Sequence, residues 1–396
     1  MQLKNCILLF FLWISTVALG QPDKLNSNAQ VSVITCGPGQ DLYASFGHSA
    51  FRIQDPAQGI DRVYNYGTFN FNAPNFYYNF AIGRPIFSLS VSKFSDFLYS
   101  YQLENRWVKE QLLVLNDEEK NALFTFLERN KRPENRDYKY DYLYDNCSTK
   151  IPDVLKEVLG QQLIFEDGDL LTNSSFRDLI RENLQSNSWS SFGIDLALGA
   201  VIDRKIKRRE EMFIPFKVRD QIATAQLSNK PLLKRERTIL EATTKRGGFY
   251  FTTSPLFWFA LLMVFTVAIS YIDITNKVRS RLLDFFLFFI TGITGLLIFF
   301  LWFLTDHSAT AVNLNILWAF PLNLVGCFYL VKKCNQLPLW FDKFLLGLII
   351  LLVLALLLWI IGVQSFSPII SIIMTTLAIR YFFLYYHFRK LQRSSI

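Results

Sequence analysis

Long apolar stretches fill the last third of the chain, from Pro255 onward, and short polar segments separate them. A helix that crosses the hydrocarbon core of a membrane needs roughly 17–25 apolar residues. Five stretches have about this length: 255–274, 282–304, 315–331, 344–363 and 367–386. The pattern therefore predicts an all-α transmembrane domain of five helices over residues 251–396.

Basic residues mark alternate segments between these predicted spans. The segments after the first, third and fifth spans contain Lys277, Arg279, Arg281, Lys332, Lys333, Lys343, Arg389, Lys390 and Arg393. The other loops, 305–314 and 364–366, contain no Lys or Arg. Positive charge is retained on the cytoplasmic side, so residues 21–250 are expected outside the cytoplasm. Arg380 lies inside the last predicted span, and we expect its long side chain to reach the cytoplasmic interface.

The first twenty residues have the pattern of a secretory signal peptide. Lys4 precedes an apolar core at 7–17, and the small residues Ala18 and Gly20 follow it. Cleavage is expected before Gln21. Signal peptide and charge bias thus agree on an exported domain at residues 21–250.

In the exported part, the pattern changes from strand-like to helix-like along the chain. Apolar and polar residues alternate in "QVSVITCGPG", "LYASFGHSAFRI" and "DRVYNYGTFNF", which contain or end in turn-forming glycines. Later, "NDEEKNALFTFLERN" has a helical pattern, with Asn116 as its cap and Glu119 three residues on. Segregated strands and helices predict an α+β domain.

Composition supports this division and excludes one class of partner. The chain is 51% hydrophobic and carries a net charge of +8. Residues 250–396 hold +6 of that charge, and residues 21–249 hold only +1. The basic excess therefore follows from membrane topology, and no nucleic-acid partner is expected.

Cys147 is the first residue with candidate chemistry, in "YDYLYDNCSTKIPDVL". A disulfide with Cys36 is compatible with an oxidising compartment. A zinc site is not expected, because the exported domain offers only two cysteines and His48 as soft ligands. The start of a helix lowers a thiol pKa, and Cys147 lies near such a start, with Thr149 as a cap that would place Pro152 harmlessly in the first turn. Cys147 is therefore a candidate nucleophile.

His48 is the candidate base because it is the only histidine of the exported domain. A lone histidine in a strand is more often structural, but its small neighbours in "FGHSAF" let another group approach the ring. A third residue should orient the imidazole. If the strand pairs with "RVYNYG" as a hairpin, the neighbour on the same face is Asn65 or Tyr66, depending on the register. Asn65 is the preferred candidate.

Two further segments contain polar or aromatic residues of interest. The loop "TDHSATAVNLN" faces the same compartment as Cys147, and its Asp306, His307 and Asn313 could bind a phospholipid head group or an amine. His307 could even be the working base, with His48 structural, or the loop could simply be polar. The aromatic-rich "TFNFNAPNFYYNFAIG" could line a groove for an acyl chain, or it could be ordinary core.

The order of these motifs resembles a known family. A strand with His48, a second strand, helices and then "DNCSTK" resemble a circularly permuted papain-like fold. More specifically, "GHSAFRI", "VYNYGTFNF", "ENRWVKEQLL", "YDYLYDNCSTK" and "FLWFLTDHSATAVNLNILWAFPLN" resemble the Lnb-type family of membrane proteins from Bacteroidota. The resemblance covers nearly the whole mature chain.

That resemblance implies a lipoprotein N-acyltransferase of the inner (cytoplasmic) membrane with a periplasmic N-terminal domain. Such an enzyme moves an acyl chain from a phospholipid to the α-amine of a diacylglyceryl-cysteine lipoprotein. Cys147 would carry the acyl thioester, and His48 would act as base and then as acid. No metal and no cofactor are expected. The third role, assigned to Asn65, rests on spacing and not on the family motif.

Two other functions remain open from the residues. Permuted papain-like sites also support a membrane-anchored cysteine peptidase or amidase. A Cys36–Cys147 disulfide would instead fit a non-enzymatic membrane receptor or scaffold.

Overall fold

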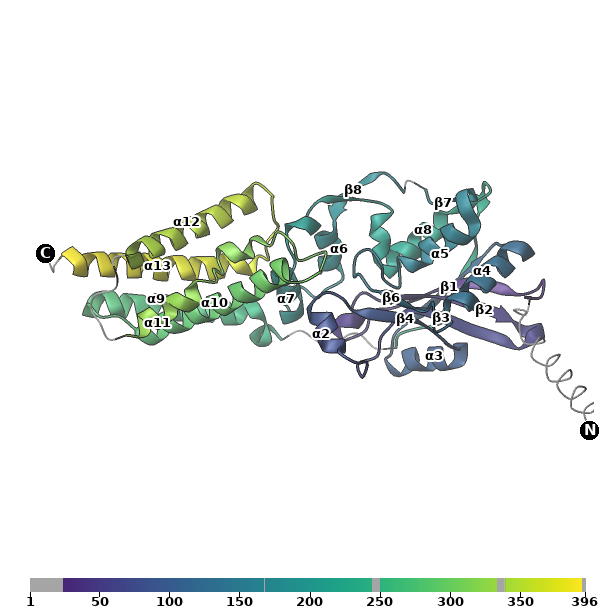
Figure 1. Cartoon of the computed structure of the whole chain (residues 1–396), viewed down its shortest axis with the longest axis horizontal. Helices are drawn as coiled ribbons and strands as arrows, with labels where there is room; N and C mark the ends of the chain where they lie inside the picture. Colours follow the sequence, from purple (N-terminus) through teal and green to yellow (C-terminus); the bar gives the residue numbers. More distant parts are fainter. Residues whose placement is uncertain (1–23, 167, 244–249, 333–337, 339, 394–396) are drawn as a thin grey trace, which may run out of the picture.

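The computed structural model describes residues 24–166, 168–243, 250–332, 338 and 340–393. It has two parts, an exported domain of mixed α and β structure and a helical membrane domain (Figure 1). The predicted signal peptide, residues 1–20, lies outside the described residues.

A seven-stranded sheet forms the centre of the exported domain. Its strand order is β12-β5-β1-β2-β3-β4-β6, and each neighbouring pair is antiparallel. The strands are β1 (Gln30–Cys36), β2 (His48–Asp55), β3 (Ile60–Thr68), β4 (Ile86–Lys93), β5 (Val108–Leu113), β6 (Asp137–Lys139) and β12 (Leu233–Leu240). The predicted hairpin of "SFGHSAFRI" with "RVYNYG" is thus the β2–β3 pair.

Helices cover both faces of this sheet because its strands bury apolar residues on both sides. On one face, α4 (Asp117–Asn130), α5 (Lys150–Leu159) and α8 (Pro215–Thr224) pack against side chains such as Val33 and Phe51. On the other face, α3 (Phe94–Leu103) packs against Ile34 and Ala50. Successive strand residues point to opposite faces, which accounts for this alternation. The predicted cap of α4 is confirmed, since Asn116 and Glu119 form a reciprocal capping box.

Smaller elements lie between the sheet and the membrane domain. They are α2 (Phe76–Ala81), α6 (Phe176–Glu182), α7 (Trp189–Ala197) and the strand pair β8 (Leu171–Ser175) with β9 (Lys205–Lys207). A three-stranded sheet forms from β7 (Leu163–Ile164), β10 (Gln226–Leu227) and β11 (Lys230–Pro231). Next to the membrane domain, the fully buried Arg177 of α6 pairs with Asp195 and Asp203. These ion pairs join α6 to α7 and to the turn before β9.

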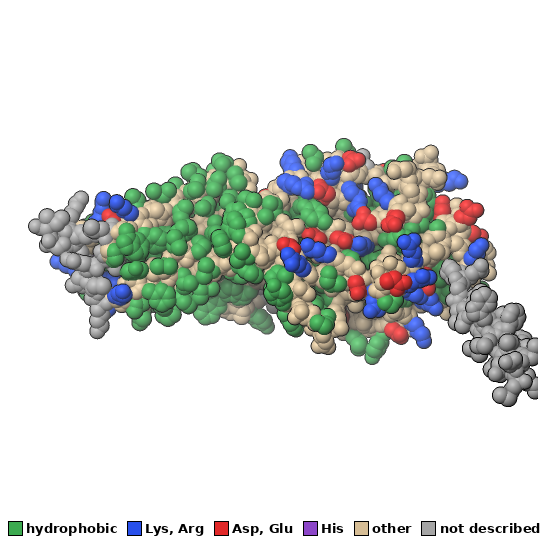
Figure 2. All heavy atoms as spheres, viewed as in Figure 1, with side chains coloured by type: hydrophobic (Ala, Val, Ile, Leu, Met, Phe, Trp, Pro, Cys, Tyr) green, Lys and Arg blue, Asp and Glu red, His purple; other side chains and the backbone are tan. Residues whose placement is uncertain are grey.

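Among the described residues, four helices of the membrane domain are long and apolar enough to cross a bilayer. They are α9 (Pro255–Asn276), α10 (Arg281–Phe303), α12 (Trp340–Ile360) and α13 (Ile369–Arg393). Hydrophobic side chains cover the visible face of this part, whereas charged ones are spread over the exported domain (Figure 2).

The third predicted span is not one continuous helix. It consists of a 3₁₀ turn, Leu314–Leu317, and the nine-residue α11 (Asn323–Val331). Pro321 lies in the break, where a proline has no amide hydrogen to continue a helix. The irregular backbone is protected by close packing on α10: a Cβ on Gly295 would lie only 2.1 Å from the carbonyl oxygen of Ala319.

Arg380 does not reach the interface as expected from the sequence. Its guanidinium is fully buried, with Nε 2.5 Å from Asp284 and Nη2 2.7 Å from Asp273. Nη1 also donates to Ser270. Two carboxylates inside the helix bundle provide the partners that make burial of this charge acceptable. The cluster ties α13 to α9 and α10.

The exported domain is hydrogen-bonded to the loops at one end of the membrane helices. The amide of Asp306 donates to the Ile82 carbonyl at 2.8 Å, and the amide of Gly199 donates to Ala309 at 2.9 Å. A third contact joins Arg181 to the hydroxyl and carbonyl oxygens of Ser365. Because these contacts come from separate loops, they fix both the distance and the orientation of the two domains.

Candidate active site

Cys147 lies in the turn that leads into α5. Asn146 caps this turn, since its Oδ1 accepts from the amides of Ser148 at 2.7 Å and Thr149 at 3.0 Å. Thr149 precedes α5 as expected, but its side chain caps no amide of the helix. Cys147 therefore follows directly after the capping residue, where the helix dipole favours an anion. Asparagine is a preferred N-cap, so the sequence carried a signal for Asn146 that spacing arguments overlooked.

His48 begins β2 and points to the same side of the sheet as Asn65 of β3. The β2–β3 register aligns Phe51 with Tyr64, which places Asn65 diagonally across from His48. His48 Nε2 and Asn65 Oδ1 form a short hydrogen bond. Tyr66, the alternative candidate, points to the other face and is buried in the core. The structure thus brings His48 and Asn65 together.

The thiol of Cys147 lies close enough to His48 for the two groups to shift each other's pKa. Asn65 engages Nε2 of the ring, so we infer that Nδ1 is the nitrogen that exchanges a proton with the sulfur. The structure therefore brings the predicted Cys147, His48 and Asn65 together as a thiol, an imidazole and an amide. In that arrangement, the amide oxygen fixes the ring and the ring exchanges a proton with the thiol.

The electrostatics of the pair favour a thiolate. Burial by itself raises the pKa of the Cys147 thiol, but the charge and hydrogen bond of His48 and the backbone amide of Ser49 outweigh it and lower the pKa to about 7. Burial likewise works to lower the pKa of His48, yet the facing Cys147 and the bond to Asn65 raise it overall. Both shifts stabilise the thiolate–imidazolium form near neutral pH.

Cys36 lies beside this site but has the opposite character. It is directly across from His48 in the β1–β2 register and is fully buried. Burial raises the pKa of its thiol to about 12. Cys36, Cys147 and Cys327 are all free thiols, so the Cys36–Cys147 disulfide of the scaffold hypothesis is not formed.

Gly67 and Tyr140 form a wall of the site that sequence reasoning missed. Gly67 has φ +83°, and a Cβ at this position would lie 3.3 Å from Cys147 Cβ and 3.7 Å from the Tyr140 ring. The glycine therefore serves both the backbone conformation and the space that the thiol needs. A glycine inside a strand pattern was the available signal.

The three residues predicted on the membrane loop have mostly structural contacts. Asp306 accepts from Nε of Arg84 at 2.6 Å, which lowers the pKa of its carboxyl group. The backbone of His307 packs against Gly83. Asn313 is fully buried, and its amide donates to the carbonyl oxygens of Leu196 and Ala197. Asn313 therefore holds the domains together and is not open to a substrate, whereas Asp306 and His307 remain partly accessible.

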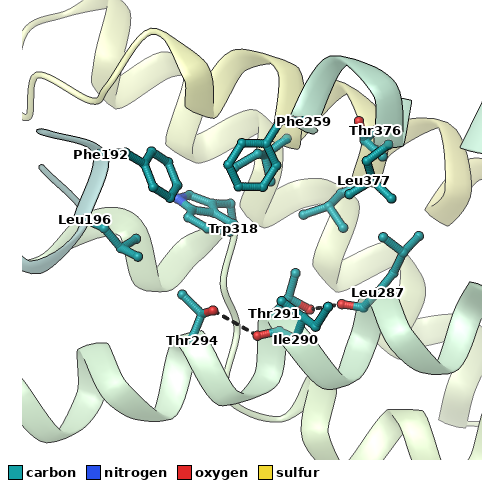
Figure 3. A pocket seen from close by; sticks show the side chains of 12 residues that line it. Phe192, Leu196, Phe259, Leu287, Ile290, Thr291, Thr294, Trp318, Thr376 and Leu377 are labelled. Carbon is teal, nitrogen blue, oxygen red and sulfur yellow. Dashed lines mark hydrogen bonds between the residues drawn. The ribbon is translucent and has the colours of Figure 1, made fainter. Parts of the chain in front are cut away.

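A cavity of about 100 Å³ lies in the membrane domain, closed on one side by Phe192 and Leu196 of α7 (Figure 3). Its wall is almost entirely apolar. The hydroxyls of Thr291 and Thr294 donate to carbonyl oxygens of their own helix, as the dashed lines in Figure 3 show. With its polar groups already paired, the cavity suits hydrocarbon and offers no acid–base chemistry.

Comparison with known proteins gives two family matches. Residues 22–182 match the Lnb N-terminal periplasmic domain, and residues 246–391 match the Lnb transmembrane domain. No curated protein and no solved structure matches the chain. Cys147, His48 and Asn65 all fall within the first match. The two matches cover most of the chain and indicate a membrane enzyme that modifies lipoproteins; the protein belongs to the Lnb-type family.

Proposed function

We propose that this protein is a lipoprotein N-acyltransferase that moves an acyl chain from a phospholipid to the α-amine of a diacylglyceryl-cysteine lipoprotein. The contact of Cys147 with His48, itself held by Asn65, carries the proposal. Membership of a family that modifies lipoproteins supports the choice of acceptor. The hydrogen bonds between the exported domain and the membrane loops explain how such a thiol can act on lipids.

In the first step, the Cys147 thiolate attacks the carbonyl carbon of a phospholipid acyl ester. The C–S bond forms and the C–O bond breaks. His48, as imidazolium, gives its proton to the leaving alkoxide, so that a lysophospholipid departs. The acyl chain is then a thioester on Cys147.

In the second step, the α-amine of the lipoprotein cysteine attacks the thioester carbonyl. The C–N bond forms, the C–S bond breaks, and neutral His48 accepts the proton that the amine loses. The thiolate–imidazolium pair is restored. Neither step changes an oxidation state, so the chemistry requires no redox cofactor.

The topology fits these substrates. We expect an inner-membrane, multi-pass protein whose exported domain is periplasmic and of permuted papain-like type. Segment 314–331 would complete a fifth crossing as a broken span, because Leu330 near its end accepts a hydrogen bond from Arg279 near the start of α10. Asp306 and His307 stay candidates for contact with a head group or amine.

Purified protein should be incubated with vesicles of labelled phospholipid and a diacylated lipopeptide. The wild type should give a hydroxylamine-sensitive acyl adduct and then an N-acylated lipopeptide, both read by mass spectrometry. Cys147→Ala should give neither. Cys36→Ser is the control. The Cys36 thiol is buried and should carry no acyl chain, so this variant should form both products as the wild type does. N-acylation by Cys147→Ala would overturn the proposal, and release of a cleaved peptide would favour a peptidase.

A further inference from the structure

Residues 69–83, between β3 and β4, expose an unusual number of aromatic side chains. We call residues 69–83 the aromatic segment. Its sequence, "FNFNAPNFYYNFAIG", has no charged residue. Tyr77 is 71% exposed and Tyr78 is 65% exposed, and Phe71 and Phe80 are also exposed. Within this segment, α2 buries none of its residues. A contiguous patch of this kind indicates an interaction surface.

The position of the aromatic segment identifies its partner. Ile82 accepts a hydrogen bond from the amide of Asp306, and a Cβ on Gly83 would lie 2.5 Å from the amide nitrogen of His307. This loop follows α10, which ends at Phe303. Figure 1 shows α2 at the end of the exported domain that faces the membrane helices. The segment is therefore held at the level where the hydrophobic helices end.

The side chains suit that level. Tyrosine has an apolar ring and a polar hydroxyl, and it is enriched where a bilayer meets water. Because the segment has no charged side chain, no charge has to leave water when the segment lies among lipid carbonyls and upper acyl chains. A lipid surface is thus the partner that both the location and the chemistry fit.

A row of aromatic rings connects this surface to the thiol. Ring centroids are 6.2 Å apart for Phe80 and Phe76, 6.0 Å for Phe76 and Phe69, and 5.1 Å for Phe69 and Phe87. Phe87 then stacks on Tyr140 at 4.2 Å. The Tyr140 ring and Cys147 flank the same side of Gly67. The rings thus contact one another in sequence from α2 to the residues beside the nucleophile, with Phe87 buried in the middle of the row.

We propose that the aromatic segment inserts into the bilayer interface next to the exported domain. There, it binds one acyl chain of an intact phospholipid and guides that lipid along the ring row to Cys147. The second part rests on the proposed function, whereas the insertion does not. The ligand is the hydrocarbon chain of a bilayer phospholipid.

Insertion is tested by photo-crosslinking in the full-length protein. Tyr78→p-benzoylphenylalanine is reconstituted in phosphatidylethanolamine vesicles whose acyl chains carry an alkyne. Tyr99→p-benzoylphenylalanine is the matched control, since Tyr99 is 60% exposed but lies on α3, away from the membrane helices (Figure 1). We expect lipid adducts at position 78 and none at position 99. No lipid adduct at 78, or adducts only to protein, would overturn the insertion.

The route to Cys147 is tested by a donor comparison. In Tyr77→Ser/Phe80→Ser, acylation of Cys147 by vesicle phospholipid should slow by about tenfold, because apolar contact with the chain is lost. Acylation by a water-soluble short-chain ester should be unchanged, as it should be for both donors in Tyr99→Ser. Equal slowing with both donors would show a general effect on the fold and overturn the route. If the wild type forms no thioester at all, the proposed function fails, yet the crosslinking result still decides the insertion.

Discussion

The side-chain oxygen of Asn65 is bonded to Nε2 of His48, and this contact leaves Nδ1 as the ring nitrogen available to Cys147. Loss of the amide would let the imidazole rotate away from the sulfur. We therefore expect Asn65→Ala to slow Cys147 acylation by about tenfold or more, within the range of acid–base contributions. The acylation rate measures this loss, and rates of alkylation by iodoacetamide across pH show whether the thiolate is less populated in the variant. An unchanged rate and pH profile would show that the ring is held by something else.

The pH dependence of alkylation should report the lowered pKa of Cys147. The thiolate is the reactive form, so the rate should rise with pH through a midpoint near the pKa of about 7 and fall by about tenfold per unit below it. In His48→Ala, the midpoint should move up, because the largest lowering influence is removed. Cys36, whose pKa is raised to about 12, should stay unlabelled over the same range. A midpoint that does not move in His48→Ala contradicts the pairing.

Gly67 and Gly59 form a matched pair of glycines with left-handed backbone. Their φ angles are +83° and +64°, but only at Gly67 would a Cβ meet Cys147, whereas nothing lies within 4 Å at Gly59. Both alanine variants should lose about 1 kcal/mol of unfolding free energy from backbone strain. Only Gly67→Ala should also slow acylation. Thermal unfolding measures the loss of stability, and the acylation assay measures the loss of activity. Equal activity losses in Gly67→Ala and Gly59→Ala would contradict a steric effect of position 67 on Cys147.

Gly199 tests whether the two domains must remain docked. A Cβ at this position would lie 1.8 Å from the carbonyl oxygen of Ala311, so Gly199→Ala must push the membrane loop away. We expect slow acylation by vesicle phospholipid but normal alkylation of Cys147 by iodoacetamide. Gly193→Ala on α7 is the control, since it has no neighbour within 4 Å and alanine favours a helix. Normal transfer in Gly199→Ala would show that docking is dispensable.

The buried charge cluster should dominate the stability of the membrane domain. Arg380→Met leaves Asp273 without a buried cation and Asp284 with Arg279 alone, and it should cost about 3–5 kcal/mol. Adding Asp273→Asn should restore part of this loss, because it removes the carboxylate that has lost its cation. Arg389→Ala, on the exposed face of the same helix, should have little effect. Unfolding in detergent, followed by protease resistance, would rank the variants; equal stability of Arg380→Met and Arg389→Ala would contradict the cluster's role.

Local features were predictable from the sequence, and long-range ones were not. Asn116 and Glu119 cap α4 through contacts three residues apart, so the pattern contained all that was needed. Asn65 could be paired with His48 because a hairpin restricts the choice to neighbouring positions. Arg380, in contrast, finds Asp273 and Asp284 about a hundred residues away, and no periodicity reports such a contact.

The third predicted span shows a different limit. Its hydrophobicity is sufficient for a helix, but Pro321 interrupts the hydrogen bonds, and the break is tolerated only because Gly295 and Gly292 let α10 approach closely. The glycines that make room for the break therefore lie on α10, outside the segment whose sequence was read. Similarly, Asn313 looked like a ligand because its loop is polar, although its burial depends on the carbonyl oxygens of α7.

The separate loop contacts that fasten the exported domain have a consequence for selectivity. A sulfur kept at one height above the bilayer can meet only reactive groups that sit at that same depth. A diacylglyceryl anchor holds the amine of every lipoprotein at a common depth, whatever polypeptide follows. Under the proposed function, geometry alone would then let one enzyme serve many different acceptors while soluble amines in the same compartment are spared.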